Sequence, residues 1–262
     1  MPATLRILTE QRRAGYGAGG EPQPKSASNP VLGARVFRMT RILVSGFPHT
    51  GTTIVRKVIG NHPSVYEVCR ECSRVPEEAV RNGSGQKATH IVFKQPIYAR
   101  GIGVNDLRNF QAFAEKLVLI IRNPFDTMGS IYRRFGGTSA IEASGHDLAA
   151  YLRYCEFFRE IRGCRNVVHL IYEELFAPPM RDWERLFGEV GLAWDERVLR
   201  NSRTAVMRDG KNPHVQYRQN QINQPLADRT GHSKRWCPDG LKDKILGSES
   251  VRAIYANLPD YA

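Results

Sequence analysis

Short runs of β-branched and aliphatic residues alternate along the chain with longer stretches in which apolar residues recur at helical spacing. The apolar runs lie at 42–46, 90–94, 117–121 and 167–172. The helical patterns lie near 52–61, 73–82, 105–115, 124–135 and 147–162. Apolar strands that alternate with helices are typical of a parallel sheet covered on both faces. We therefore expect an α/β fold with a doubly wound, mostly parallel sheet that binds its ligands beyond the carboxyl ends of the strands.

The two ends of the chain lack this alternation. Residues 14–34 are rich in Gly, Pro, Ala and Ser and have no hydrophobic periodicity, which is typical of a flexible tail or linker. Met39 stands directly before the first strand and is a candidate translation start. We expect residues 1–38 to be a flexible extension whose removal leaves folding and ligand binding intact, and residues 39–262 to be a single domain. Residues 202–236 are polar and irregular, as a substrate-covering segment would be.

The formal net charge of +12 is the unusual feature of the composition. Residues 1–41 hold seven basic and two acidic side chains, or +5, which leaves +7 for the remainder of the chain. Such a field attracts an anionic small molecule or a glycan, although a solvated basic surface without a partner is the alternative. The basic residues are dispersed and no aromatic-interleaved basic stripe occurs, so we expect no nucleic-acid partner.

The five cysteines and the absence of a signal sequence indicate a reduced compartment. We find no continuous apolar segment near the N-terminus and no run of 18 apolar residues, and we expect a cytoplasmic protein without a membrane span. Cys69 and Cys72 have the spacing of a redox site or half of a zinc site. No second Cys/His pair is suitably placed to complete a zinc site, so we expect no metal.

The first chemical motif is S-G-F-P-H-T-G-T-T at 45–53, between the first strand and the first helix. Gly46 and Gly51 have the spacing of a phosphate-binding P-loop, but Thr52 stands where that loop has its lysine. Backbone N–H groups and the positive end of the helix dipole make such a turn an anion site. A helix cap without a ligand is the alternative, since Thr is a normal capping residue.

The second motif follows the strand at 117–121. This strand ends in Arg122-Asn123-Pro124 and not in the acidic Mg²⁺ ligand that a kinase would require. An arginine at this position suggests a bidentate contact with a second phosphate. Ser130 lies eight residues further on, about two turns into the helix expected after Pro124, where it could face the same phosphate.

The two motifs together resemble those of the sulfotransferases that use 3′-phosphoadenosine 5′-phosphosulfate. F-P-H-T-G-T-T corresponds to the 5′-phosphosulfate loop, and I-I-R-N-P-F-D-T-M-G-S corresponds to the 3′-phosphate element. The resemblance covers roughly residues 41–240 and implies a P-loop-like sulfotransferase fold, no metal, and adenosine 3′,5′-bisphosphate as the nucleotide product. It implies that the 5′-phosphate is held by Thr50, Gly51, Thr52 and Thr53. It implies that the 3′-phosphate is held by Arg122 and Ser130.

His49 departs from the family pattern, because this position is normally the Lys or Arg that stabilises charge on the bridging oxygen of the leaving nucleotide. A protonated histidine in that role would make activity depend on pH, and a loop histidine facing solvent is the alternative. Lys94, in Lys-Gln-Pro, resembles the lysine that contacts the transferring sulfuryl group in tyrosylprotein and several bacterial sulfotransferases; an ordinary surface lysine is the alternative. Pro96 stands where cytosolic sulfotransferases have their catalytic histidine.

The general base is therefore expected elsewhere. The stretch G-N-H-P-S-V-Y-E-V-C-R-E-C-S-R resembles the segment after the loop helix in tyrosylprotein sulfotransferases, with two extra residues. By this match Glu71 is the candidate base and Glu67 is second. A solvated Glu71 paired with Arg70 or Arg74 is the alternative.

Two mutually exclusive matches occur near the C-terminus. Arg229 and Trp236 resemble a segment that closes over the nucleotide in cytosolic members, whereas Ser233 and Lys234 resemble an S-K-W segment of the tyrosylprotein type. The Y-E-x-L pattern within 170–175 also resembles a strand end of the family, and we expect it to be structural.

Taken together, the resemblance implies sulfuryl transfer from 3′-phosphoadenosine 5′-phosphosulfate to a hydroxyl or amine by in-line displacement. Carbohydrate is the first acceptor class that we expect and protein tyrosine is the second. The alternatives are a degenerate P-loop nucleotide kinase and a non-catalytic nucleotide-binding protein.

Overall fold

The computed structural model describes residues 39–72, 74–97, 113–200 and 226–255. The described residues fall within one unit of the chain. The expected N-terminal extension, most of the helix expected at 105–115 and most of the polar segment 202–236 lie outside them.

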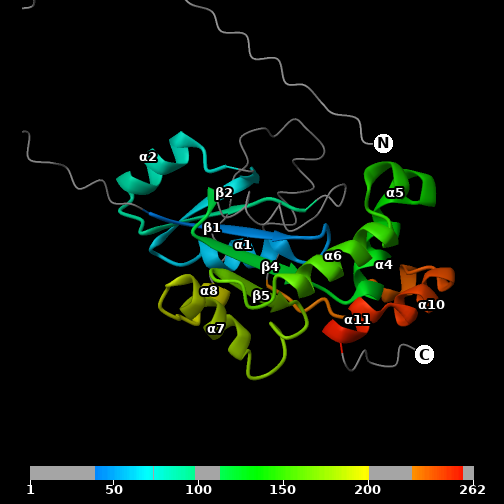
Figure 1. The fold of residues 1–262 in the computed structure, drawn as a ribbon. Helices are drawn as coiled ribbons and strands as arrows, with labels where there is room; N and C mark the ends of the chain where they lie inside the picture. The colour runs from blue at the N-terminus through cyan, green and yellow to red at the C-terminus, as the bar shows by residue number, and fades with distance from the viewer. Residues whose placement is uncertain (1–38, 73, 98–112, 201–225, 256–262) are drawn as a thin grey trace, which may run out of the picture. The chain divides into compact units, whose positions relative to one another are not determined.

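The described strands form one five-stranded parallel sheet, in the order β2-β3-β1-β4-β5. The strands are β1 (Thr40–Gly46), β2 (Val65–Glu71), β3 (His90–Lys94), β4 (Lys116–Ile121) and β5 (Val167–Ile171). From β1 the chain passes to β2 at one edge of the sheet and returns to β3 beside β1. It then crosses to β4 and β5 on the other side of β1, so the direction of winding reverses beside β1 (Figure 1). This is the doubly wound α/β fold predicted from the sequence, and ligands bind such sheets at the reversal.

Helices cover both faces of the sheet. On one face lie α1 (Thr52–Gly60), α7 (Arg181–Val190) and α8 (Arg197–Arg200). On the other lie α2 (Glu77–Gly85), α4 (Pro124–Phe135), α5 (Thr138–Ser144), α6 (Leu148–Glu160), α10 (Asp239–Gly247) and α11 (Glu249–Ile254). Alternate residues of β1 and β4 enter the two cores, so both strands are almost continuously apolar.

Two differences between the structure and the predicted elements lie next to each other in the chain, at β2 and α2. Strand β2 was not predicted, because its sequence VYEVCRE contains three charged residues and it lies at the edge of the sheet. Edge strands tolerate such residues, so β2 lacks the apolar run that marked the inner strands. Helix α2 begins at Glu77 and not at residue 73, because Pro76 is its N-cap and the residue before a proline disfavours helical geometry.

Helix α4 begins directly beyond β4. The Asn123 side chain accepts a hydrogen bond of 2.9 Å from the Phe125 N–H, and Pro124 occupies the first helical position, where its missing N–H costs nothing. Helices α4, α5 and α10 gather at one end of the sheet (Figure 1). Arg122 is thereby held at the junction between β4 and α4.

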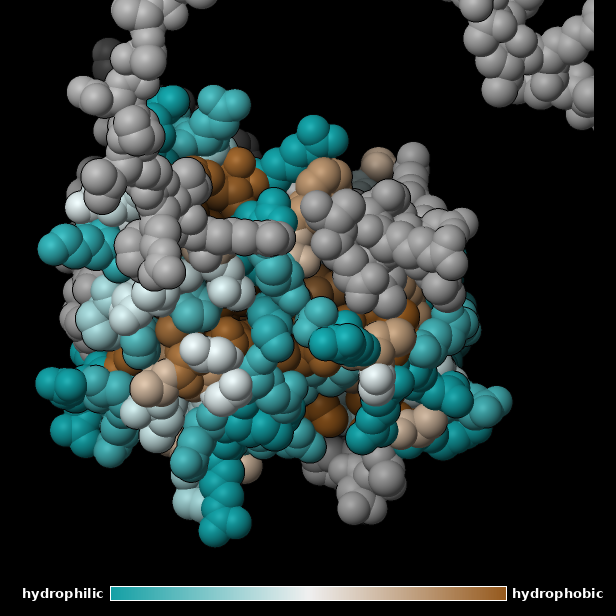
Figure 2. Space-filling view, turned by 60° about the vertical axis from the view of Figure 1, so that its left-hand side comes forward, coloured by the Kyte–Doolittle hydropathy of each residue, from teal (hydrophilic) through white to brown (hydrophobic). Residues whose placement is uncertain are grey.

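The surface of the described residues is mostly polar. Hydrophilic side chains cover most of the face in Figure 2, with small groups of hydrophobic side chains between them. Three large hydrophobic side chains of the described residues are exposed, and they lie on separate segments: Val80, Met180 and Leu246. None of the helices described here combines the length and apolarity that crossing a bilayer requires.

Candidate nucleotide and catalytic site

The loop between β1 and α1 has two residues in the left-handed region. His49 has a φ of 71°, and Gly51, the N-cap of α1, has a φ of 104°. A Cβ atom on Gly51 would lie 2.6 Å from the Tyr172 ring. Glycine is therefore required at position 51 both by the backbone conformation and by the close approach of Tyr172.

The N-terminus of α1 presents backbone donors toward this loop. No side chain caps the helix, so N–H groups of its first turn have no capping acceptor. The Thr50 hydroxyl donates to the Phe47 carbonyl oxygen at 2.7 Å, and the Thr50 N–H donates to the same oxygen at 3.2 Å. Thr50 thus closes the loop with both of its donors, while Thr52 and Thr53 begin the helix. The uncapped end and its dipole make a site for an anion.

His49 connects this loop to helix α4. Its Nδ1 lies 2.9 Å from the Ser130 Oγ, at hydrogen-bond distance. Burial is the main cause that lowers the pKa of His49 to about 3, and nearby basic side chains contribute to this lowering. His49 is therefore neutral in the ligand-free protein at ordinary pH. The contact brings together the two sets of residues that the sequence assigned to the 5′- and 3′-phosphates.

Arg122 is buried beside the same loop. Its guanidinium carbon lies 4.5 Å from the centre of the Tyr172 ring, the ring that packs against Gly51. Its Nη2 donates to the Arg229 carbonyl oxygen and lies 3.5 Å from an oxygen of Asp126. Its Nε is buried and has no hydrogen-bond partner among the described residues. A buried guanidinium with an unused donor fits an anionic ligand.

Lys94 lies at the carboxyl end of β3, with its side chain 9% exposed. Its Nζ donates to the Thr53 Oγ1 at 2.8 Å and lies 3.0 Å from the Glu71 Oε1. The structure therefore brings the two residues predicted for the sulfuryl group and for the base, Lys94 and Glu71, into contact at the start of α1. Glu67 lies apart from this pair, in an ion pair of 2.9 Å with the buried Arg56.

The segment 226–237 packs on α4. The N–H of Ser233 donates to an oxygen of Asp126 at 2.9 Å, and a Cβ atom on Gly129 would collide with the Ser233 carbonyl oxygen. The side chains of Arg229 and Lys234 are exposed. Both matches proposed for this segment therefore fall beside the 3′-phosphate element.

Trp236 lies in the short 3-10 helix η1 (Lys234–Trp236). Its ring is flanked by two guanidinium groups, with the carbon of Arg133 at 4.4 Å and that of Arg235 at 4.1 Å from its centre. Cation–π contacts of this kind help to hold η1 on α4.

Sequence reasoning missed two residues of this site. Asp126 is fully buried and accepts backbone hydrogen bonds from Gly231 and Ser233. Its position four residues after Arg122 was a weak signal, because an acidic residue in the first turn of a helix is common. Tyr172 was expected to be structural, yet its ring contacts both Gly51 and Arg122.

The cysteines form no disulfide among the described residues, where all five are free thiols. Cys72 packs against the core that contains α2 and α4. Within the described ranges no three His, Cys, Asp or Glu side chains cluster in a way that could hold a metal ion.

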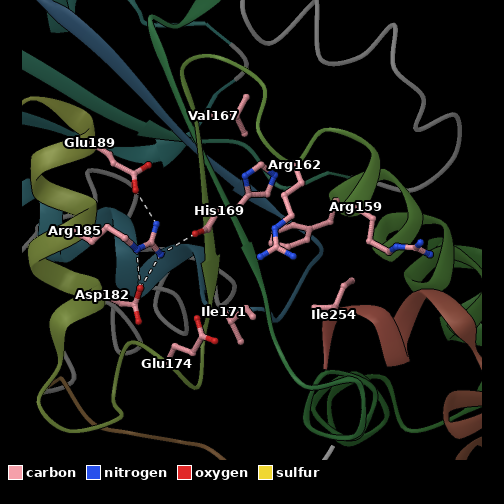
Figure 3. A pocket seen from close by; sticks show the side chains of 11 residues that line it. Arg159, Arg162, Val167, His169, Ile171, Glu174, Asp182, Arg185, Glu189 and Ile254 are labelled. Atoms are coloured by element: carbon pink, nitrogen blue, oxygen red, sulfur yellow. Dashed lines mark hydrogen bonds and ion pairs between the residues drawn. The ribbon is translucent and has the colours of Figure 1, made fainter. Parts of the chain in front are cut away.

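A separate pocket of about 450 Å³ lies at the outer edge of β5 (Figure 3). It is lined by residues of α6, β5, α7 and α11, and none of the candidate site residues lines it. Arg185 donates to the His169 carbonyl oxygen at 3.0 Å and pairs with Asp182 and Glu189 at 2.7 and 2.8 Å. The Arg185 guanidinium, which is paired with two carboxylates, thus covers the β5 edge of the sheet at His169.

Comparison with known proteins found matches among solved structures only. No protein-family model matches the chain, and no curated protein matches it. The sulfotransferase domain from the Synechococcus PCC 7002 olefin synthase is 15% identical and matches with a TM-score of 0.57, covering 84% of this chain and 96% of that domain. The chain has the sulfotransferase fold.

Two further structures with the sulfotransferase fold agree with this assignment. Mouse sulfotransferase SULT7A1, solved in complex with PAP, is 13% identical with a TM-score of 0.52, covering 84% of this chain and 89% of that one. The sulfotransferase domain from the curacin biosynthetic pathway is 14% identical with a TM-score of 0.50, covering 84% and 98%. The fold predicted from the two motifs is thus confirmed, and the roles of single residues are argued from this chain's own contacts.

Proposed function

We propose that the chain is a sulfotransferase that moves a sulfuryl group from 3′-phosphoadenosine 5′-phosphosulfate to a hydroxyl or amine acceptor. The observation that carries this proposal is that the uncapped N-terminus of α1 and the buried Arg122 both lie against the Tyr172 ring. One end of the sheet thus offers two separate anion sites. The presence of PAP in the mouse sulfotransferase supports the same nucleotide.

The residues present fit this donor. Gly51, Thr52 and Thr53 would hold the 5′-phosphate through the first turn of α1, with Thr50 closing the loop around it. Arg122 and Ser130 would hold the 3′-phosphate, and the unpartnered Nε of Arg122 is the donor that a phosphate oxygen would satisfy. The segment with Arg229, Ser233 and Lys234 would cover the nucleotide. These nine assignments remain predictions for mutagenesis.

Glu71 and Lys94 would carry out the chemistry. The donor supplies an activated sulfuryl group. Glu71 would accept the proton of the acceptor as its oxygen or nitrogen forms the bond to sulfur and the bond from sulfur to the bridging oxygen breaks. Lys94, which already lies between Thr53 and Glu71, would stabilise charge on the sulfuryl oxygens. His49, which contacts Ser130, would lie beside the bridging oxygen of the leaving nucleotide.

The acceptor class is the less defined half of the proposal. The basic balance of the chain favours an anionic or carbohydrate acceptor, and the resemblance around Glu71 favours protein tyrosine. We propose carbohydrate first. A screen of both classes with labelled donor distinguishes them.

Nucleotide binding tests the proposal against its alternatives. Adenosine 3′,5′-bisphosphate without Mg²⁺ is expected to raise the melting temperature, and ATP with Mg²⁺ is expected to raise it much less. The opposite ranking would favour the degenerate kinase, and binding without turnover of any acceptor would favour a non-catalytic nucleotide-binding protein.

Two substitutions separate binding from chemistry. Arg122→Ala is expected to weaken adenosine 3′,5′-bisphosphate binding about 10- to 100-fold, as expected for loss of a charged hydrogen-bond donor. The control Arg159→Ala, on the exposed end of α6, is expected to leave it unchanged. Glu71→Gln is expected to spare binding and to lower turnover about 10²- to 10⁴-fold. Unchanged turnover would reject Glu71 as the base.

A further inference from the structure

Strand β2 pairs irregularly with β3. Val65, Tyr66 and Glu67 lie opposite His90, Ile91 and Val92 in regular register, but the next pair is Glu71 opposite Lys94. Four steps along β2 thus correspond to two steps along β3. The irregularity lies directly before the candidate base, and bulges beside active sites commonly redirect a side chain.

The irregularity decides which residue lies beside Lys94. If the register of Glu67 and Val92 continued, Cys69 would lie opposite Lys94. Residues paired directly opposite each other in a parallel sheet point to the same face. The two extra residues therefore replace a thiol with the Glu71 carboxylate at 3.0 Å from the Lys94 Nζ. The register after the irregularity is held by a hydrogen bond of 3.0 Å from the Cys72 N–H to the Lys94 carbonyl oxygen.

Arg56 on α1 contacts this irregular stretch from inside the protein. Its side chain is 1% exposed, and its Nη1 donates to the Cys69 carbonyl oxygen at 2.7 Å. Its Nε lies 2.9 Å from an oxygen of Glu67, so the guanidinium contacts β2 on the regular side and within the irregularity. A bulge takes backbone groups out of the ladder, and a buried carbonyl oxygen left without a donor is costly.

We propose that Arg56 is a positioning residue that keeps Glu71 beside Lys94 by stabilising the irregular part of β2. This inference rests on the proposed function, because it assigns the base to Glu71. The first turn of α1 would bind the donor and its second turn holds β2. One helix thereby sets the position of the base relative to the nucleotide.

Amide hydrogen exchange tests the positioning without reference to activity. The Arg56→Met/Glu67→Gln double variant removes the guanidinium together with the negative charge that pairs with it, and Glu67→Gln alone is the matched control that keeps Arg56 on Cys69. In the double variant the Cys72 amide is expected to exchange about tenfold faster or more. The Gln95 amide, which donates to Val44 at 3.2 Å on the other side of β3, is expected to stay as it is. An unchanged Cys72 amide would overturn the proposal.

Turnover of labelled donor with a mixture of carbohydrates and tyrosine peptides gives the second readout. The affinity of the double variant for adenosine 3′,5′-bisphosphate is expected to stay within about twofold of that of the parent. Its kcat is expected to fall about 10²-fold and the pH profile of kcat to shift, because Glu71 is no longer held beside Lys94. The fall in kcat is measured against Glu67→Gln, which carries the second change of the double variant, and Arg56→Lys is expected to recover part of the lost kcat. A parallel loss of kcat and nucleotide affinity, or an unchanged kcat, would overturn the proposal.

The two readouts keep this inference separate from the proposed function. If the parent chain binds no adenosine 3′,5′-bisphosphate, the proposed function fails. The Cys72 exchange rate then still decides whether Arg56 holds the register of β2 at Glu71.

Discussion

Histidine at position 49 behaves differently from the lysine or arginine found there in the resembling family. Its pKa is lowered to about 3, mainly by burial and in addition by four neighbouring basic side chains: Arg134, His146, Arg122 and Lys94. In the ligand-free protein the positive charge near His49 therefore comes from Arg134, Arg122 and Lys94, and a bound anion would favour protonation of His49.

The ionisation of His49 can be followed by NMR. Its imidazole signals, assigned with the His49→Gln variant, are expected not to titrate between pH 5 and 8 without ligand, a window that lies above a pKa of about 3. Saturating adenosine 3′,5′-bisphosphate is expected to raise the midpoint of the His49 titration. A midpoint near 6.5 in the ligand-free chain would contradict the buried, neutral state.

Glu173 gives the fold a pH dependence of its own. One of its oxygens accepts the Asn123 N–H at 2.9 Å, while burial raises its pKa from 4.5 to about 7. Between these values the folded chain keeps a proton that the unfolded chain releases. The contribution of Glu173 to stability is therefore fully present below about pH 4.5 and is lost as the pH rises toward 7.

Denaturant titrations at several pH values test this assignment. Glu173→Gln is expected to reduce the loss of unfolding free energy between pH 4.5 and 7 by up to about 1.4 kcal/mol per pH unit, because an amide can accept the Asn123 N–H without binding a proton. Glu160→Gln, an exposed change on α6, is expected to leave the slope as in the parent. Equal slopes in parent and Glu173→Gln would refute the raised pKa.

At the scale of elements, the junction between the loop and α1 depends on Gly51. Gly51→Ala is expected to cost about 1–3 kcal/mol, because alanine is strained at a φ of 104° and its Cβ would meet the Tyr172 ring. It is also expected to weaken adenosine 3′,5′-bisphosphate binding, since the loop and Arg122 both contact that ring. Gly137→Ala, at an extended position with open space around it, serves as the control in melting and calorimetric measurements.

The sequence was most informative where a site residue belongs to a contiguous motif. The loop at 45–53 and the Arg122–Ser130 pair each combine a strand end with the first turns of a helix, so spacing alone indicated their approximate positions. Tyr172 and Asp126 could not be assigned in this way. Their roles depend on contacts with Gly51 and with the segment 231–233, which are distant in the sequence.

Strand β2 shows a second reason why prediction failed. Its charged residues have specific partners, with Glu67 at Arg56 and Glu71 at Lys94, but a sequence gives only their polarity. The register of β2 shifts between Glu67 and Glu71, and nothing in the hydrophobic periodicity indicated an irregular strand.

At the scale of the whole molecule, the predicted order of elements was sufficient for the fold class. Apolar runs separated by helices imply parallel strands, and the central strands β1, β3 and β4 were recognisable because both of their faces are buried. The order of strands in the sheet required the structure, because hydrophobic periodicity does not tell which strands are neighbours.

The guanidinium at the outer edge of β5 also affects how copies of the chain meet. A sheet edge with unpaired carbonyl groups is a template for another strand, but here the His169 carbonyl oxygen is already bonded to Arg185. An incoming strand would have to displace a side chain held by Asp182 and Glu189. Arg185→Ala is therefore expected to increase self-association at high concentration in light scattering, and an unchanged particle size would show that this edge needs no such protection.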